Sequence, residues 1–339
     1  MTSAGSRRSN SHWFRILRSV VEVALAVVAG YAIFAQRRNF ALAIGLFAHL
    51  RWGWVGIAIL AEMASMGAFA RMQRWLLRIG GTTLHLWAMI EITLAGNALS
   101  VSLPGGAAWS TVWALDQLRR REAPRHLVVW VLVVSGVLSS VTISGILIAG
   151  VWIAGDKGPS SDLRWPLLAV AITLIGGSAI LVFHQRSRTA RGATSKHLAR
   201  FSSESRVRKA IEEIGRYART VDPRWQDWTA SLFFALMNWL TDIGCLVASI
   251  VALHITVPWY GILATYGVTQ LAASLPITPG GIGVVEGSLS LMLAAYGLSL
   301  SDAVAATVLY RVISFWLLVP IGWMTWAIIK LRQRGIAGA

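Results

Sequence analysis

The chain has 339 residues, of which 55% are hydrophobic and only 14% are charged, with a net charge of +16 and a mean hydropathy of +0.60. A soluble protein of this length carries about a quarter charged residues, whereas several apolar runs here approach or exceed the ~18–20 residues that cross about 30 Å of hydrocarbon. The composition excludes a soluble globular protein and a nucleic-acid-binding domain, because the basic residues cluster beside apolar runs, where they orient spans and contact anionic lipid.

The N-terminal residues 1–18 are basic and precede the first apolar run, 19–35. The sequence AIFA at 32–35 resembles a signal-peptide cleavage site. Because Arg37 and Arg38 follow at once and further apolar runs come after them, we expect an uncleaved first span with residues 1–18 in the cytoplasm.

Other full-length spans follow in chain order, and their expected ranges are 53–70, 126–153, 165–183, 229–253 and 303–329. Two further apolar segments end in proline-glycine breaks and continue as segments too short to span comfortably. The resulting pairs are 84–103 with 107–118 and 259–275 with 283–296.

Basic loops set the expected orientation, because Lys and Arg accumulate on the cytoplasmic side. The loop 184–228 holds eleven Lys or Arg against five acids, and the cluster at 119–125 precedes a span. A single crossing by 84–103 would place both of these segments outside. If 84–118 instead enters and returns as a re-entrant hairpin, the loop and the basic cluster lie in the cytoplasm, together with both termini and the tail 331–339. The basic residues that do not follow the rule are then Arg37, Arg38 and Arg51. Within the loop, 207–218 is either an amphipathic helix on the inner leaflet or a solvated connector.

The two breaks indicate an internal repeat. A shift of 175 residues aligns the first Pro-Gly-Gly triplet with the second, and it also aligns the flanking spans. The two triplets are Pro104, Gly105 and Gly106, and Pro279, Gly280 and Gly281. Three crossings per half make the second half inverted. We therefore expect an all-α inverted repeat, 19–153 and 165–330, with re-entrant hairpins at 84–118 and 259–296. Discontinuous helices at equivalent places are typical of transporters, whose sites lie near the midplane.

The second break, SLPITPGGIGVVEG at 274–287, is the strongest site candidate. Prolines end the incoming helix, and the helix that begins near Gly283 would direct its amides and dipole at the break, which suits an anion such as phosphate. The alternative is a tight turn between packed helices. The candidate headgroup contacts in the break are Thr278, Pro279, Gly280, Gly281 and Gly283.

Glu286 and Arg311 lie in otherwise apolar segments, where an ionisable group usually has a partner and a function. Arg311 neutralises Glu286, binds a lipid phosphate, or alternates between the two. A static structural ion pair is the competing interpretation.

Further polar residues are expected at membrane depth as a secondary or coupling site. Asn238 and Asp242 are four residues apart and share a helix face. Asp242 or Glu62 is a candidate proton carrier, whereas Asn97 and Asn238 suit hydrogen bonds between helices. Gln270 lines the second break or caps backbone groups, and the first break contributes Pro104, Gly105 and Gly106.

The runs SLPITPGGIGVVEG and AAYGLSLSDAVAATVLYRVISFW resemble the hallmark of the flippase-like, lysylphosphatidylglycerol-synthase-type transmembrane family. AGNALSVSLPGGAAWSTVWALDQLRRREAP resembles its upstream motif, and the resemblance extends over roughly 15–330. It implies a bundle that moves a phospholipid or lipid-linked headgroup between leaflets. No aminoacyl-transfer domain is recognisable, so lipid synthesis is not expected. The matched residues are Asn97, Pro104, Gly105, Pro279, Gly280, Gly281, Gly283, Glu286 and Arg311.

One departure from the family pattern matters. Its upstream motif usually has a basic residue and an acid where Gly106 and Trp109 stand here. A charged site is therefore expected mainly in the second half of the chain.

The sequence thus predicts a lipid flippase in a bacterial plasma membrane. The alternative is a non-transporting scaffold or an accessory subunit of an envelope-lipid synthase. An intramembrane enzyme ranks last, because no nucleophile or metal constellation is present and His49, His85 and His254 are far apart. We expect no cofactor, a lipid substrate, and either a homo-oligomer or a partner synthase.

Overall fold

The computed structural model of the chain describes residues 49–103, 106–155, 223–274 and 278–337, together with Trp165 and Ala169. Every secondary-structure element in these residues is a helix. Four of the helices are long and apolar enough to cross a membrane: α3 (Trp52–Ile79), α6 (Arg125–Ala154), α9 (Trp225–Ala252), and the run Leu300–Arg334 that α12 and α13 form. The protein is therefore a multi-pass α-helical membrane protein.

The expected spans 53–70, 126–153, 229–253 and 303–329 each coincide with one of these helices. The span 19–35 lies outside the described residues, as do 165–183 apart from Trp165 and Ala169, residues 184–222 of the loop, and Pro104 and Gly105. The helix α3 continues nine residues beyond the expected end, because Arg71, Arg74 and Arg78 recur at helical spacing on its exposed face.

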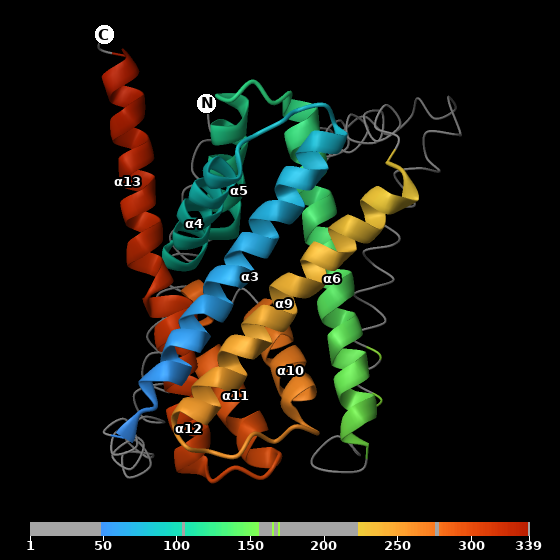
Figure 1. Cartoon of the computed structure of the whole chain (residues 1–339), viewed down its shortest axis with the longest axis vertical. Helices are drawn as coiled ribbons and strands as arrows, with labels where there is room; N and C mark the ends of the chain where they lie inside the picture. The colour runs from blue at the N-terminus through green and yellow to red at the C-terminus, as the bar shows by residue number, and fades with distance from the viewer. Residues whose placement is uncertain are drawn as a thin grey trace, which may run out of the picture.

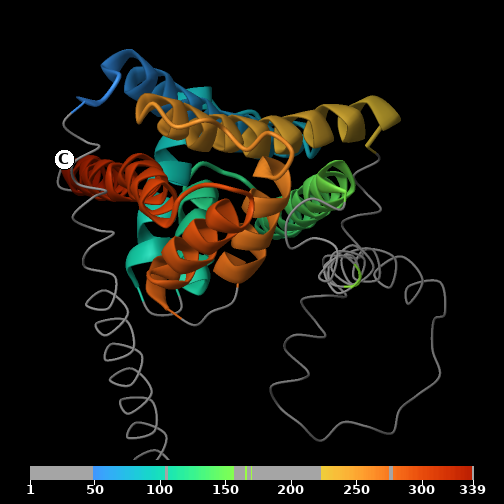
Figure 2. The ribbon, with the colours of Figure 1, turned by 90° about the horizontal axis from the view of Figure 1, so that it is seen from below.

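The long helices run in opposite directions in pairs (Figure 1). The helix α3 ascends and α9 descends beside it, and these two helices form the largest interface between any two elements that the structure describes. Likewise α6 descends, whereas α12 (Leu300–Arg311) and α13 (Leu318–Ala337) ascend. Viewed from below, α3 and α9 form one layer, and the shorter helices lie on one side of it, which is behind the layer in the view of Figure 1 (Figure 2).

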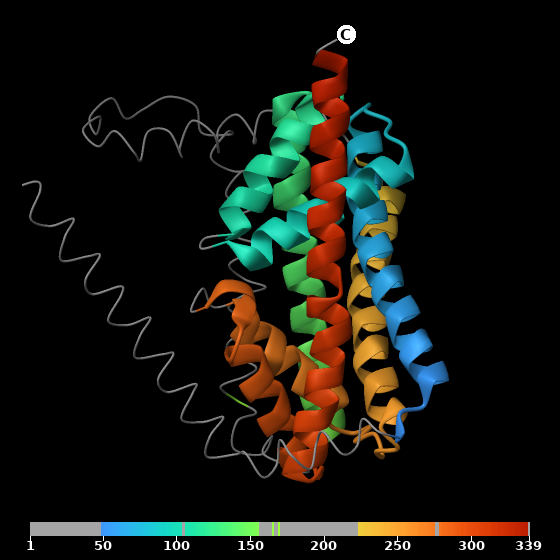
Figure 3. The same cartoon turned by 90° about the vertical axis from the view of Figure 1, so that its left-hand side faces the viewer.

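Two helical hairpins fill the space behind that layer. The first hairpin consists of α4 (Leu86–Ser102) and α5 (Gly106–Arg119), and the second of α10 (Ile262–Ser274), the 3-10 turn η2 (Pro279–Gly281) and α11 (Val284–Ala295). The first hairpin lies in the upper half of the molecule and the second in the lower half (Figure 3). Their tips meet, since η2 packs against α4. Helices of 12 to 17 residues are about 18–25 Å long, so none of these helices spans ~30 Å of hydrocarbon alone.

Each hairpin packs against a long helix from the other part of the chain. The helix α13 packs on α4, and α6 packs on α10. Glycines allow these close approaches: a Cβ atom on Gly322 would lie 2.4 Å from the Leu94 carbonyl oxygen, and one on Gly150 would lie 2.4 Å from the Ala264 backbone nitrogen. Small residues at the crossing let helix backbones approach closely inside a membrane.

Each hairpin also has its own apolar core. One core surrounds the second hairpin and includes Ala58 of α3 and Leu246 of α9, and the other surrounds the first hairpin and includes Leu76 of α3 and Ala235 of α9. The polar residues of α3 and α9 lie between these two cores. Basic residues gather at the upper end of Figure 1, where α3, α5 and α13 end and α6 and α9 begin; they include Arg78, Arg119, Arg125, Arg224 and Arg332.

The last span differs from the expected uninterrupted helix. A π-helical segment, η3 (Val312–Trp316), separates α12 from α13, and the Leu317 amide donates to the Val312 carbonyl five residues earlier. Pro320 accounts for the change, because it has no N–H to offer the Trp316 carbonyl and its ring crowds that oxygen. Such π segments are frequent at functional sites, and this one directly follows Arg311.

Candidate functional site

The tip of the second hairpin is held by the guanidinium of Arg311, a residue that is only 8% exposed. Its Nε atom donates to Glu286 Oε1 at 2.7 Å, and an Nη atom donates to the Gly280 carbonyl at 3.1 Å. The ring of Phe315 in the π segment covers the guanidinium, with its centroid 4.1 Å from Cζ. The structure thus brings Glu286 and Arg311 together, 25 residues apart in sequence.

Glu286 also caps the helix that carries it. Its Oε2 atom accepts the Gly283 backbone N–H at 2.6 Å, which places a negative charge at the N-terminus of α11. The sequence predicted that amides at this helix start would face an anionic ligand. Here the carboxylate of Glu286, whose side chain is 31% exposed, takes that place. A ligand phosphate would therefore compete with a carboxylate that the protein itself supplies.

Gly280, Gly281 and Thr278 shape the backbone turn at the break. Gly280 has φ +62°, and a Cβ atom there would lie 2.6 Å from the Phe315 ring and 2.9 Å from the Val101 carbonyl oxygen at the tip of the first hairpin. Thr278 donates its hydroxyl to the Ile282 carbonyl at 2.9 Å, so it caps the backbone of the turn. Pro279 begins η2, and Gly281 donates to the Thr278 carbonyl at 3.1 Å.

A second polar cluster surrounds Asp242 on α9. Tyr266 of α10 donates to Asp242 Oδ2 at 2.6 Å, and Tyr310 of α12 donates to Oδ1 at 2.8 Å. The carboxyl of Glu62 on α3 lies within hydrogen-bonding reach of Asp242. Gln270 donates to the Tyr266 hydroxyl at 2.8 Å. The amide of Gln270 thus joins this cluster, four residues before the end of α10, and its expected place lining the second break stays a prediction.

Other predicted residues have smaller roles in the geometry. Asn238 accepts a hydrogen bond from Ser65 at 3.2 Å and joins α9 to α3, as expected for a helix-bridging amide. Asn97 is partly buried on α4, and Gly106 begins α5. Pro104 and Gly105 lie outside the described residues.

The sequence did not point to Tyr266, Tyr310, Phe315 or Ser65. Two signals were present, since Tyr310 directly precedes Arg311 and Tyr266 lies four residues before Gln270. A tyrosine in a membrane helix is ordinary, however, and only the fold shows that two of them face one carboxylate.

Both clusters lie at one depth. Glu62 is ten residues from the first residue of α3, Asp242 is ten residues from the last residue of α9, and Arg311 is eleven residues from the first residue of α12. These three helix ends are all at the lower end of Figure 1. At 1.5 Å per residue the three side chains lie about 15 Å from that end, which is half the thickness of a typical hydrocarbon core.

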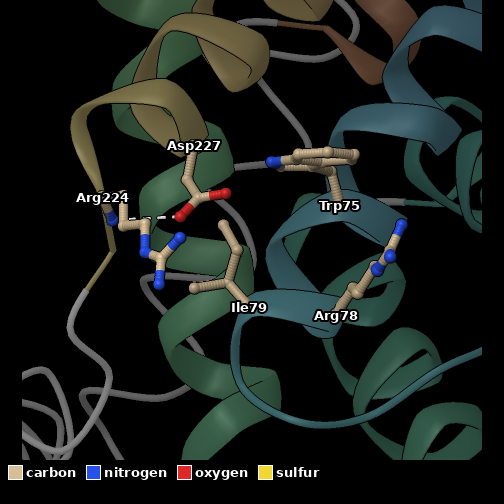
Figure 4. Close-up of a pocket in the computed structure, with 5 residues that line it drawn as sticks. All are labelled: Trp75, Arg78, Ile79, Arg224 and Asp227. Carbon is tan, nitrogen blue, oxygen red and sulfur yellow. Dashed lines mark hydrogen bonds between the residues drawn. The ribbon is translucent and has the colours of Figure 1, made fainter.

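A pocket of about 300 Å³ lies elsewhere, at the basic end of α3 and α9 (Figure 4). It is lined by Trp75, Arg78, Ile79, Arg224 and Asp227. The Arg78 guanidinium stacks over Trp75, with 5.6 Å between Cζ and the ring centroid, and Asp227 accepts the Arg224 backbone N–H at 3.0 Å. Arg78 is exposed and Trp75 is partly buried, and both residue types are usual at the headgroup level of a membrane protein. The pocket shares no residue with the buried ion pair of Glu286 and Arg311.

Comparison with known proteins agrees with this architecture. The chain is 23% identical over 293 residues to the UPF0104 membrane protein MJ1595 of Methanocaldococcus jannaschii, an alignment that covers 82% of this chain and 85% of that protein. It is 27% identical over 119 residues to a UPF0104 membrane protein of Methanothermobacter thermautotrophicus, which covers 35% of each chain. The family model described as the lysylphosphatidylglycerol synthase TM region matches residues 20–322. The chain therefore belongs to the family of the lysylphosphatidylglycerol synthase transmembrane region.

Proposed function

We propose that this protein is a transporter that moves an anionic phospholipid or a lipid-linked headgroup between the two leaflets. The observation that carries the proposal is the Glu286–Arg311 ion pair at a broken helix in the middle of the bundle. A buried guanidinium beside non-helical backbone is costly in a membrane, and such groups mark substrate pathways.

The chemistry of Arg311 suits exchange between two anions. Its guanidinium has five N–H donors, and the two hydrogen bonds to Glu286 and Gly280 leave further donors for a phosphate. A phosphate that enters would replace Glu286 on Arg311. The released carboxylate would keep its hydrogen bond from the Gly283 amide, so the tip of the hairpin would stay capped.

The arrangement of helices supports alternating access to this site. We propose that the chain is an inverted repeat in which α3, the first hairpin and α6 correspond to α9, the second hairpin and α12–α13. The opposite directions of these helices and the approach of the hairpins from opposite ends fit that interpretation (Figures 1 and 3). Rocking of one half against the other would expose the shared middle first to one side and then to the other.

The basic end of the bundle supports one orientation in the membrane. We propose that the end with Arg78, Arg119 and Arg224 faces the cytoplasm of a bacterial cell, with both termini on that side. The first hairpin would then enter from the cytoplasm and the second from outside.

Lipid translocation by purified protein tests the proposal. Liposomes of phosphatidylethanolamine and phosphatidylglycerol would contain acyl-labelled fluorescent phosphatidylglycerol, and dithionite would bleach the label in the outer leaflet. We expect wild-type protein to make the inner pool accessible, and Glu286→Gln and Arg311→Ala to abolish that effect while they remain folded and inserted.

A non-transporting scaffold predicts a different pattern. In that case wild-type protein would translocate no phosphatidylglycerol or other anionic lipid. The two substitutions would be harmless in cells, whereas deletion within the loop 184–228 would abolish function.

A further inference from the structure

Two carboxyl groups from different parts of the chain meet between α3 and α9. Neither is part of the proposed exchange, in which a phosphate replaces Glu286 on Arg311. Glu62 is 3% exposed, and its carboxyl lies within hydrogen-bonding reach of Asp242. We propose that Glu62 and Asp242 hold one proton between them, and that this proton travels with the anionic headgroup. The coupling rests on the proposed transport function, whereas the proton site itself does not.

The hydrogen-bond donors around the two carboxyl groups indicate which of them carries the proton. Asp242 already accepts two hydrogen bonds, one on each oxygen, from Tyr266 and Tyr310. Glu62 Oε2 is buried and has no hydrogen-bond partner among the described residues. Two ionised carboxylates offer only acceptors to each other, so contact between them requires a proton on one. A protonated Glu62 that donates to the Asp242 carboxylate satisfies both groups. The negative charge then lies on Asp242, because its hydrogen bonds from the two tyrosines favour the ionised form.

The surroundings supply little else to balance a second charge. The ionisable groups around the pair are Cys245 on α9, Tyr266 on α10, and Tyr310 and Arg311 on α12. Ser65 and Asn238 bond to each other one turn away on the same interface. Loss of the proton would leave two negative charges in an apolar interior, where like charges repel strongly.

Arg311 links this pair to the headgroup site. It is the neighbour of Tyr310 in sequence, and its positive charge acts on Asp242 as well as on Glu286. A deprotonated pair would attract the guanidinium and compete with a phosphate for it. A protonated pair would leave Arg311 free for the phosphate. Proton binding and anion binding therefore support each other, and by linkage each strengthens the other by the same factor.

This coupling gives a direction of movement. The proton comes from water on the side where the pair is accessible, binds the Glu62 carboxylate, and returns to water on the opposite side after the headgroup has moved. One proton and a headgroup with one negative charge cross together as a neutral pair. A pH difference of one unit would then shift the leaflet ratio of that lipid about tenfold at equilibrium.

Infrared spectroscopy tests the proton site without any transport. We expect purified protein in nanodiscs at neutral pH to show a C=O band of a protonated carboxyl, which Glu62→Gln removes. Glu91→Gln is the matched control, because Glu91 is a partly exposed acid that pairs with Arg332, and it should leave the band unchanged. The glutamine amide can still donate to Asp242, so E62Q should melt close to the wild-type temperature. A spectrum with no band that depends on Glu62 would overturn the shared proton.

Liposomes with a pH difference test the coupling. With acyl-labelled phosphatidylglycerol as the probe, we expect the leaflet ratio to follow the gradient in wild type and in E91Q, and to be independent of it in E62Q. An unchanged gradient dependence in E62Q would overturn the coupling. Absence of any translocation by wild type, with the infrared band present, would overturn the transport function and its coupling while the proton site stands.

Discussion

The two hairpins have similar geometry and different chemistry. Each consists of two short helices joined at mid-depth, and each packs against a long helix through a glycine, Gly322 or Gly150. At the tip of the first hairpin the described contacts are neutral, such as the hydrogen bond from Trp323 to the Ser102 hydroxyl at 3.2 Å. The tip of the second hairpin holds an ion pair.

This difference distinguishes residues that pack the fold from residues that could bind a substrate. Close packing at the glycines serves both hairpins alike, because both must sit against a long helix. Charge is concentrated at the second tip, where the Gly280 carbonyl and Glu286 share Arg311. The first tip then provides a packed surface, the Val101 carbonyl, against which the second tip rests. Substitutions at the two tips should therefore have unequal effects on transport.

The largest effect is expected for Arg311→Ala. It removes the partner of Glu286 and the donor to Gly280, and it also removes the cation over Phe315. Breaking a buried ion pair costs about 3 kcal/mol here, the low end of the usual range, because the Glu286 side chain is still 31% exposed. We expect loss of phosphatidylglycerol translocation together with a lower melting temperature in detergent.

Arg311→Lys separates the charge from the shape of the side chain. Lysine keeps the positive charge but has no planar fork to hold Glu286 and the Gly280 carbonyl together. We expect stability to recover in part and translocation to remain strongly reduced. Full recovery of translocation with lysine would show that a point charge suffices at this tip.

Gly280→Ala is expected to rank next. Its φ of +62° disfavours a side chain, and the added Cβ would lie 2.6 Å from the Phe315 ring. We expect a loss of about 1–3 kcal/mol, as for overpacking elsewhere, measured by thermal denaturation. The matched control is Gly287→Ala in α11, where a Cβ atom meets nothing within 4 Å and alanine favours the helix by about 0.5–1 kcal/mol. Equal melting temperatures for the two variants would contradict the tight turn.

The sequence predicted the helices well because apolar length and proline-glycine breaks are local signals. The ranges 126–153 and 283–296 differ from α6 and α11 by only one residue at each end. The π segment was missed because its cause, Pro320, acts on a carbonyl four residues away inside a continuous apolar run. The continuation of α3 to Ile79 is not predicted by the sequence, because the arginines after residue 70 mark only the end of the apolar run, whereas a helix can continue beyond the membrane with an exposed basic face.

The candidate site could be predicted only in part. Glu286 and Arg311 stand out because charges are rare in apolar segments, and their partnership followed from that rarity. Glu62 and Asp242 were visible for the same reason, but nothing local shows that residues 180 positions apart share a contact. The sequence also does not predict that Glu286 caps its own helix. It depends on a side-chain rotamer that the ion pair with Arg311 fixes.

The two packing glycines offer a paired measurement with a smaller effect on transport. Gly150→Ala and Gly322→Ala each push a long helix away from a hairpin backbone 2.4 Å from the added carbon. We expect similar losses of about 1–3 kcal/mol in both variants, because the two crossings are alike. A large loss at one position only, measured by thermal denaturation, would show that the hairpins are not equally supported.

Ser102→Ala is expected to have the smallest effect and makes the comparison of the two tips sharpest. The substitution removes the acceptor of the Trp323 indole at an exposed position, where water can replace it, so the loss should be below about 1 kcal/mol. Phosphatidylglycerol translocation should stay at the wild-type level, because no charge is lost. A loss of translocation as large as that of Arg311→Ala, in a variant that melts like wild type, would place the working site at the first tip. The charged second tip would then serve only to hold the hairpin in shape.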